Sequence, residues 1–87
     1  MSPYKERTNN NKITREFSVN VDSDDLVWHR DKRDRNVRVV EGVGWQLQFD
    51  DEMPIELVEG EVYFIPKNHY HRIIKGFNSL SVEITEE

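Results

Sequence analysis

Short runs of apolar residues, separated by glycine, proline and other turn-forming residues, recur along the chain. Apolar and polar positions alternate over residues 13–21, where Phe17, Val19 and Val21 share one face, and again over residues 80–84, as expected of half-buried strands. Further strands are predicted over residues 26–29, 37–40, 45–49, 55–58, 62–65 and 71–76. No segment sustains the 3.6-residue period of a helix. Seven or eight short strands at even spacing predict an all-β sandwich or barrel.

The start of the chain differs from the rest. Residues 1–12 are mostly polar, and we expect a flexible N-terminal tail there, or an arm that orders only against a partner subunit. Residues 13–87 contain no linker and no repeat and are predicted to form a single domain. A chain of 87 residues buries only about 60 to 65% of its unfolded surface. Its stability as a monomer is therefore marginal, and we expect a homodimer.

Composition narrows the classes of partner and site. The chain has no cysteine, which excludes disulfides and thiolate metal sites and suits a cytoplasmic location. We expect no membrane partner, because no apolar run approaches transmembrane length and the N-terminus lacks an apolar leader segment. The net charge of −5 argues against a nucleic-acid partner.

Residues 60–76 are predicted to form a strand, a tight turn and a second strand. Pro66 has no N–H to donate and ends the first strand. Asn68 suits the bend because it tolerates a left-handed backbone conformation. His71 then opens the next strand, at the mouth of a rigid turn.

Two spaced sets of residues resemble the two motifs of the cupins, which are small double-stranded β-helix (jelly-roll) domains. The second cupin motif, Gly-x5-Pro-x-Gly-x2-His-x3-Asn, is matched in spacing by Gly60, Pro66, Asn68, His71 and Lys75. The first, Gly-x5-His-x-His-x3/4-Glu-x6-Gly, is matched in spacing by Ser23, His29, Asp31, Arg35 and Gly42. Together the motifs cover residues 23–76, and the resemblance implies a cupin-type jelly-roll barrel.

The resemblance also implies a metal site inside the barrel. At the ligand positions of the cupin motifs this chain has His29, Asp31, Arg35 and His71. His29 and Asp31 are two residues apart and would face the same way on a strand. With His71 they resemble the two-histidine, one-carboxylate set that holds non-haem iron. The expected cofactor is one divalent metal, Fe, Mn, Ni or Zn, or none if the site is degenerate.

Arg35 departs from the cupin pattern, which has glutamate at this position. A guanidinium cannot ligate a metal. At ~5 Å and an effective dielectric of ~20 it would repel a divalent ion by roughly 6–7 kcal/mol before screening. Either Arg35 pairs with Asp31 in a metal-free site, or it binds an anionic substrate beside the metal.

Three further polar residues are candidates for substrate contact. His69 lies two residues before His71, on the turn. Gln46 and Gln48 alternate with Trp45, Leu47 and Phe49, and we expect the apolar face of this strand to line the core. In the opposite register the two glutamines would face the cavity.

Two functions are compatible with these residues. The first is a small-molecule-binding, metal-dependent cupin that acts on a small anionic substrate. In it His29, Asp31 and His71 hold the metal and Arg35 orients the substrate. The second is a metal-free, non-catalytic cupin that binds a ligand or serves as an interaction module. The sequence identifies neither a substrate nor a reaction.

Overall fold

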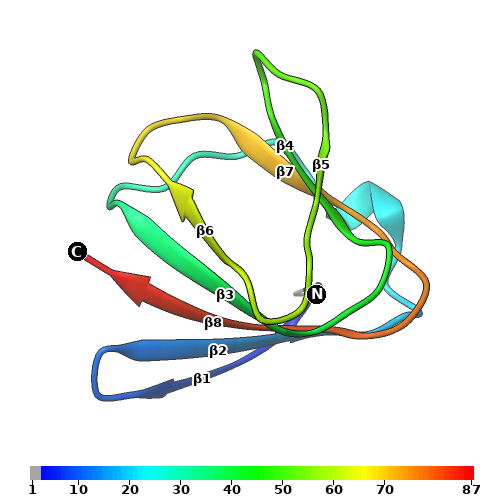
Figure 1. Ribbon diagram of the computed structural model, residues 1–87, viewed down its shortest axis with the longest axis horizontal. Coiled ribbons are helices and arrows are strands. Elements are labelled where there is room, and N and C mark those ends of the chain that lie inside the picture. Colours follow the sequence, from blue (N-terminus) through cyan, green and yellow to red (C-terminus); the bar gives the residue numbers. More distant parts are fainter. Residues whose placement is uncertain (1–2) are drawn as a thin grey trace.

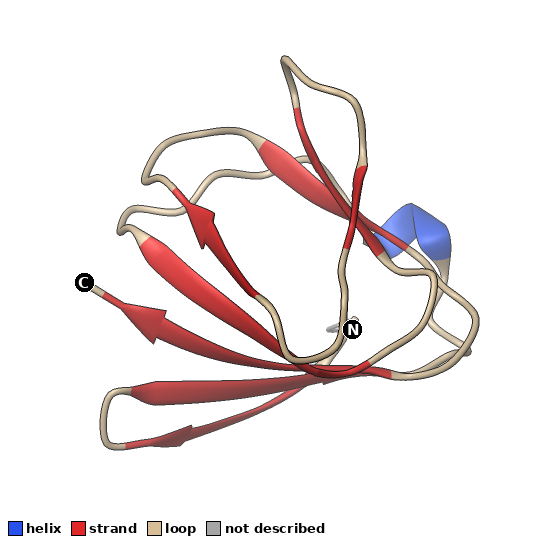
Figure 2. Cartoon of the chain, in the orientation of Figure 1, coloured by secondary structure: helices blue, strands red, loops and turns tan. Residues whose placement is uncertain are grey.

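Strands make up nearly all of the regular structure of residues 3–87, which are the residues that the computed structural model describes. In chain order the elements are β1 (Lys5–Asn9), β2 (Lys12–Phe17), a short 3-10 helix η1 (Ser23–Asp25), β3 (Arg35–Glu41), β4 (Gln46–Phe49), β5 (Ile55–Glu56), β6 (Val62–Ile65), β7 (His71–Ile74) and β8 (Leu80–Glu86). Figure 2 shows how far the strands dominate the chain. The predicted all-β class is confirmed.

The strands form two antiparallel sheets that face each other across the core (Figure 1). The larger sheet has the order β1-β2-β8-β3-β6, and the smaller has the order β5-β4-β7. Sequence neighbours β3 and β4 therefore lie in different sheets, and β8 returns to lie between β2 and β3. None of the helices in residues 3–87 is long and apolar enough to cross a membrane.

The inner face of the larger sheet follows from its register. Directly paired residues of antiparallel strands point to the same face, and Ile84 of β8 pairs with both Ile13 and Val37. Val82 of β8 likewise pairs with Arg15 and Val39. The core contains eleven buried apolar side chains: Phe17, Val21, Val37, Val39, Trp45, Leu47, Leu57, Ile65, Leu80, Val82 and Ile84. The inner face of β2 therefore carries one charged residue, Arg15, between two apolar ones.

Trp45 is one of the largest side chains that are fully buried in the core. Its indole Nε1–H donates a 2.7 Å hydrogen bond to the Asn78 carbonyl oxygen. The chain passes close to this ring at Gly76, where a Cβ atom would collide with Trp45 and with the carbonyl oxygen of Val43. Gly76 is therefore required by close backbone packing.

Three predicted segments differ from the structure. The strand predicted over residues 13–21 ends at Phe17, because the Ser18 side chain and carbonyl accept hydrogen bonds from Asn20 and Val21 and form a turn instead. The strand predicted over 26–29 is absent: residues 26–28 are irregular chain that follows the short helix η1, and only His29 forms a single bridge.

The third difference concerns the predicted tail. Within residues 1–12, the structure forms strand β1 and the start of β2, which pair with each other. Met1 and Ser2 lie outside the described residues. All five residues of β1 are exposed, so the polar composition reflects an edge strand.

The predicted strand–turn–strand of residues 60–76 is confirmed. β6 ends at Ile65, directly before Pro66, and β7 begins at His71. Asn68 has a φ of 62°, the left-handed conformation that the turn was predicted to need.

Candidate metal centre

His29 and His71 are brought together by their own backbones. Each donates its N–H to the carbonyl oxygen of the other, at 3.0 and 2.9 Å, in an isolated antiparallel bridge. Such a mutually bonded pair holds its two side chains on the same side of the ladder. The imidazole centroids are 4.4 Å apart, and the His71 side chain is buried.

Asp31 follows His29 on a loop that is tied to the turn before β7. Its carbonyl oxygen accepts a 2.7 Å hydrogen bond from the Asn68 N–H, and the Asp34 carboxylate accepts one from the Lys67 N–H. The Asp31 side chain is mostly buried and faces His71 across 3.3 Å, measured from Oδ2 to Nε2. His29 and Asp31 were expected to share a strand face; they lie instead on a loop with one bridge, and their ligand atoms nevertheless cluster with that of His71.

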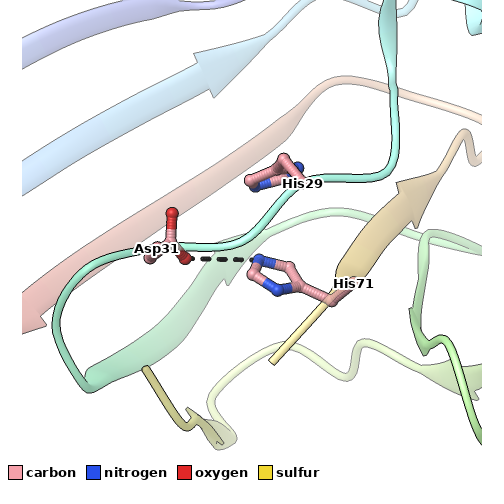
Figure 3. Close-up of side chains that lie close together, drawn as sticks. All are labelled: His29, Asp31 and His71. Carbon is pink, nitrogen blue, oxygen red and sulfur yellow. Dashed lines mark ion pairs between the residues drawn. The ribbon is translucent and has the colours of Figure 1, made fainter. Parts of the chain in front are cut away.

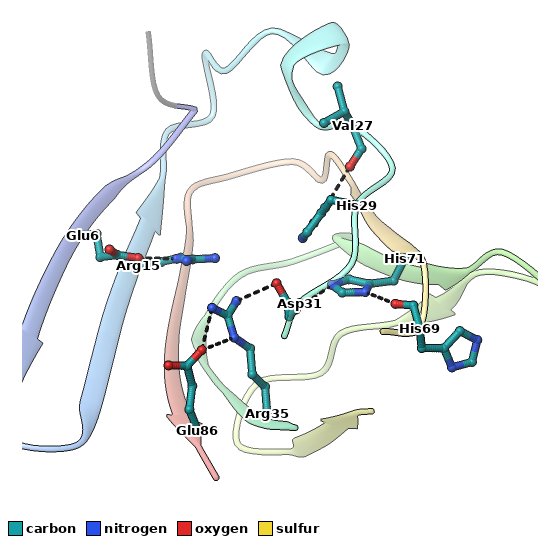
Figure 4. A network of polar contacts seen from close by, with 9 residues as sticks. All are labelled: Glu6, Arg15, Val27, His29, Asp31, Arg35, His69, His71 and Glu86. Atoms are coloured by element: carbon teal, nitrogen blue, oxygen red, sulfur yellow. Dashed lines mark hydrogen bonds and ion pairs between the residues drawn. The ribbon is translucent and has the colours of Figure 1, made fainter. Parts of the chain in front are cut away.

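Backbone carbonyls fix which nitrogen of each ring faces the cavity. The Nδ1 atom of His29 donates to the Val27 carbonyl at 3.0 Å, and Nδ1 of His71 donates to the His69 carbonyl at 2.8 Å (Figure 4). Each neutral ring then carries an unprotonated Nε2, because only one nitrogen of a neutral imidazole is a donor. Metal-binding histidines commonly have this arrangement, with the other nitrogen bonded to a carbonyl.

Within residues 3–87, no donor bonds the carboxylate oxygen that faces His71. Asp31 Oδ2 is buried, and its 3.3 Å approach to His71 lacks the direction of a hydrogen bond. Buried polar atoms are normally paired. One ligand atom from each of His29, Asp31 and His71 lies within 4.8 Å of the others (Figure 3). Two imidazole lone pairs and one unpaired carboxylate oxygen therefore converge, a donor set that fits a divalent cation.

Asp31 keeps its negative charge at neutral pH. Burial raises the pKa of this carboxyl, but the interaction with His71 and the positive charge of Arg35 outweigh burial, so the pKa lies below its ordinary value of 3.8. The carboxylate is thus available as a ligand.

Arg35 is held by two carboxylates. Its Nη1 lies 3.3 Å from Asp31 Oδ1, and its Nη2 and Nε each lie 2.8 Å from Glu86 Oε2. The pair with Asp31 uses Oδ1 and leaves Oδ2 facing the histidines. One guanidinium and two carboxylates give the group a net negative charge, so Glu86 offsets the repulsion that Arg35 alone would exert on a cation.

Glu86 is a residue of the candidate site that the sequence did not point to. It lies directly opposite Arg35 in the pairing of β3 with β8. The predicted strand over residues 80–84 stopped before it, whereas β8 continues to Glu86. The alternation of Val82 and Ile84, extended by one step, would have placed Glu86 on the inner face.

Three of the predicted substrate-contact residues lie away from the metal centre. Leu47 is buried, so the predicted apolar-inward register of this strand is confirmed, and Gln46 and Gln48 face the other side. Gln48 there accepts a hydrogen bond from Arg72. The alternative register, in which Gln46 and Gln48 would face the cavity, is therefore wrong.

His69 also points away from the cavity. Its Nε2 lies 3.1 Å from Asp51 and 3.5 Å from Asp50, and its ring stacks against Phe49. These three polar residues form a second group with ligand-like spacing, but both acids are exposed. Exposed acidic groups of this kind are common on protein surfaces without an ion.

A cavity of about 300 Å³ opens beside the candidate metal centre between the two sheets. His29, Asp31, Arg35 and His71 line one part of it. Most of the remaining wall is apolar and comes from both sheets, including Val37, Leu47, Ile65, Ile73, Val82 and Ile84. The arrangement is that of a small-molecule site, with a few polar groups in an apolar wall.

No protein-family model matches the sequence, and no curated protein matches it significantly. Solved structures do. The chain is similar to a cupin-2 domain protein from Shewanella frigidimarina, with 27% identity, a TM-score of 0.67, and coverage of 92% of this chain and 76% of that one. It is also similar to an RmlC-like cupin with a double-stranded β-helix fold from Methanocaldococcus jannaschii, with 13% identity, a TM-score of 0.77, and coverage of 99% and 81%.

Some similar structures are larger enzymes. The DMSP lyase DddQ from Ruegeria pomeroyi shares 12% identity over 87% of this chain at a TM-score of 0.74, and this chain spans 36% of it. Because the sequence identities are low, these structural likenesses establish only the double-stranded β-helix fold.

Proposed function

We propose that this chain, a member of the cupin superfamily by its fold, binds one divalent metal ion and acts on a small molecule in the adjacent cavity. His29 and His71 would ligate through Nε2, and Asp31 through Oδ2. The observation that carries the proposal is the buried Asp31 oxygen, which no donor in residues 3–87 bonds and which clusters with two histidine rings whose Nδ1 atoms are already used.

Among the candidate metals Fe, Mn, Ni and Zn, the ligand set favours iron. Two histidines and one carboxylate on one side of an ion are typical of non-haem Fe(II) sites, which keep positions open for substrate and oxygen. A similar solved structure, at 18% identity and a TM-score of 0.66, is Fe(II) HppE, of which this chain spans 41%. When bound, such a metal supplies Lewis acidity and, for iron, redox chemistry.

The protein's own groups would prepare the site. The Val27 and His69 carbonyls orient the two rings, and Arg35 with Glu86 fixes the rotation of the Asp31 carboxylate. The apolar wall excludes water from a bound molecule, which strengthens every electrostatic interaction in the cavity.

A second candidate function, a metal-free ligand-binding or interaction module, is supported by the contact between His71 and Asp31. If the His71 ring carries a second proton, its Nε2 lies 3.3 Å from Asp31 Oδ2 and the two groups form an ion pair. The carboxylate would then need no metal.

Metal content distinguishes these two functions. Protein purified without a histidine tag, then measured by plasma mass spectrometry, should contain about one metal ion per chain. His71→Ala should lose it, and the matched control His69→Ala, whose ring points away from the cavity, should keep it. A wild-type protein that takes up neither Fe(II) nor Mn(II) on soaking would contradict the metal proposal and leave the metal-free module.

A further inference from the structure

Arg15 lies where the strand pattern places an apolar side chain. It stands between Ile13 and Phe17 on the inner face of β2, opposite the buried Val82. Its side chain is only 16% exposed, and it lines the same cavity as the metal centre. A guanidinium this far from water costs free energy unless its N–H groups are paired.

Among residues 3–87, acceptors pair only with the Nε edge of this guanidinium. Its Nε donates to Glu6 Oε1 at 2.6 Å, and the Tyr4 ring centroid lies 4.3 Å from the guanidinium carbon. Within residues 3–87, no acceptor bonds either Nη group of Arg15. Figure 4 shows the guanidinium reaching from Glu6 toward the side chains of the metal centre. Its free N–H groups are thus available to a ligand.

Arg35, in contrast, has little capacity left. Asp31 and Glu86 already occupy its Nη1, Nη2 and Nε atoms. Of the two arginines that line the cavity, Arg15 is therefore the one whose planar fork can receive an incoming carboxylate.

The rest of the cavity sets the size and polarity of the ligand. At about 30 Å³ for each water-sized group, a volume of about 300 Å³ holds roughly ten non-hydrogen atoms. The wall that such a molecule would contact is largely apolar, with Leu47, Ile73, Val82 and Ile84 among its residues. One guanidinium with unpaired N–H groups, in a wall that is otherwise largely apolar, suits a compact apolar body with a single acidic group.

We propose that Arg15 binds the carboxylate of a small apolar carboxylic acid, whose body fills the cavity beside the metal centre. This inference rests on the proposed function, because it names the class of molecule that the metal centre would act on. Arg15 takes the substrate-binding role that the sequence suggested for Arg35, and Arg35 becomes a positioning residue for Asp31.

The test uses two molecules of the same shape. Phenylacetate and its neutral isostere phenylacetamide are titrated into Zn(II)-loaded protein by calorimetry. Wild type should bind phenylacetate at least about 10-fold more tightly, the effect of a charge-assisted hydrogen bond. Arg15→Gln should abolish this difference, whereas the matched control Arg7→Gln, on an exposed position of β1, should retain it.

Glu6→Gln distinguishes a ligand site from a structural ion pair. If Arg15 receives the ligand, removal of the competing carboxylate strengthens phenylacetate binding. If Arg15 and Glu6 serve only to join β1 to β2, both variants lower the melting temperature and neither changes the preference for phenylacetate. That result overturns the inference, as does a wild type that binds phenylacetate no better than phenylacetamide or binds neither.

The same samples separate this inference from the proposed function. Zinc content is measured alongside ligand binding. A wild type that holds zinc but shows no Arg15-dependent preference contradicts the Arg15 site alone. A wild type that holds no zinc but still prefers phenylacetate through Arg15 supports the Arg15 site and contradicts the metal centre.

Discussion

Two backbone carbonyls decide how His29 and His71 face the cavity. Because the carbonyls of Val27 and His69 accept from Nδ1, each neutral ring presents a lone pair at Nε2. The anionic Asp31 Oδ2 faces the same space. Three acceptors without a donor repel one another, so the group requires either a cation or an added proton. This need for a cation or a proton is the evidence for a metal at the scale of single residues.

Glu86 should matter to the metal without touching it. In Glu86→Gln the guanidinium of Arg35 loses its nearer carboxylate and keeps only Asp31, at 3.3 Å. The unbalanced positive charge should weaken metal binding about 10- to 100-fold, as loss of groups that support metal ligands typically does. Zn(II) titration of the variant measures the change.

Glu83→Gln is the control for Glu86→Gln. Glu83 lies on the same strand and pairs at 3.9 Å with the exposed Lys12. Exposed pairs of this kind contribute little, so Glu83→Gln should leave metal affinity unchanged. Equal affinities for Glu86→Gln and wild type would show that Arg35 does not act on the metal centre.

Asp31 should make the stability of the metal-free protein depend on acid pH. Its pKa is lower in the folded protein than the ordinary value of 3.8, so the unfolded chain binds the proton more readily. The contribution of Asp31 is therefore fully present above that value and is lost as the pH falls through the folded-state pKa. Urea unfolding in a chelator between about pH 6 and pH 3 should show a smaller decline for Asp31→Asn than for wild type. An identical decline would contradict the lowered pKa.

At the scale of elements, the candidate metal centre lies where the loop before β3 meets the turn before β7, two segments that are far apart in sequence. The bridge between His29 and His71 and the bond from Asn68 to Asp31 hold the loop before β3 against the turn before β7. The left-handed Asn68 directs that turn. The ligands are thus placed by backbone hydrogen bonds and not by flexible side chains, which favours a preorganised centre.

Gly76 tests the packing that supports this junction, because it follows β7 closely. In Gly76→Ala the new methyl group collides with backbone atoms of Val43 and Trp45, which cannot move aside like a flexible side chain. We expect a loss of about 2 kcal/mol or more in the free energy of unfolding. Gly60→Ala meets no atom within 4 Å and carries only the strain of its φ of 87°, about 1 kcal/mol. Equal losses in chemical denaturation would contradict the close packing at Gly76.

The sequence predicted the elements whose local pattern agrees with their final environment. In residues 60–76, strand-forming residues flank a proline and a left-handed asparagine. The structure has the two predicted strands, β6 and β7, and the predicted turn at Asn68 between them. β1 was missed because its five residues are exposed and show no apolar alternation. Segment 26–29 was predicted as a strand from its β-branched and aromatic composition, but it follows η1 as irregular chain and pairs with another strand only at His29.

Only part of the candidate site was predicted from the sequence, because some of its residues can be recognised by local spacing and others cannot. Motif spacing brings out His29, Asp31 and His71, and the structure groups them. The alternation along β8 and β2 places Glu86 and Arg15 on the inner face, but the partners of both residues depend on which strands pair, since β8 lies between β2 and β3. That strand order is set by the whole barrel and cannot be read from a local pattern.

At the scale of the whole molecule, β6 is a free edge of the larger sheet. Val62 and Phe64 on this strand are 57% and 51% exposed. Exposed apolar edge strands tend to pair with another chain, and we expect a homodimer formed through β6. Phe64→Glu should give a monomer by sedimentation velocity, and Met53→Glu, on an exposed loop, should remain dimeric. A monomeric wild type would contradict this expectation.

The most direct test of the metal centre is a long-range nitrogen–proton NMR spectrum of the three histidine side chains during Zn(II) titration. We predict that His29 and His71 both carry their ring proton on Nδ1 in the metal-loaded protein. Their Nε2 signals should shift at about one equivalent of zinc, while those of His69, which faces Asp50 and Asp51, stay in place. If zinc leaves the Nε2 signals of His29 and His71 unchanged, or moves only those of His69, these residues do not form a metal centre.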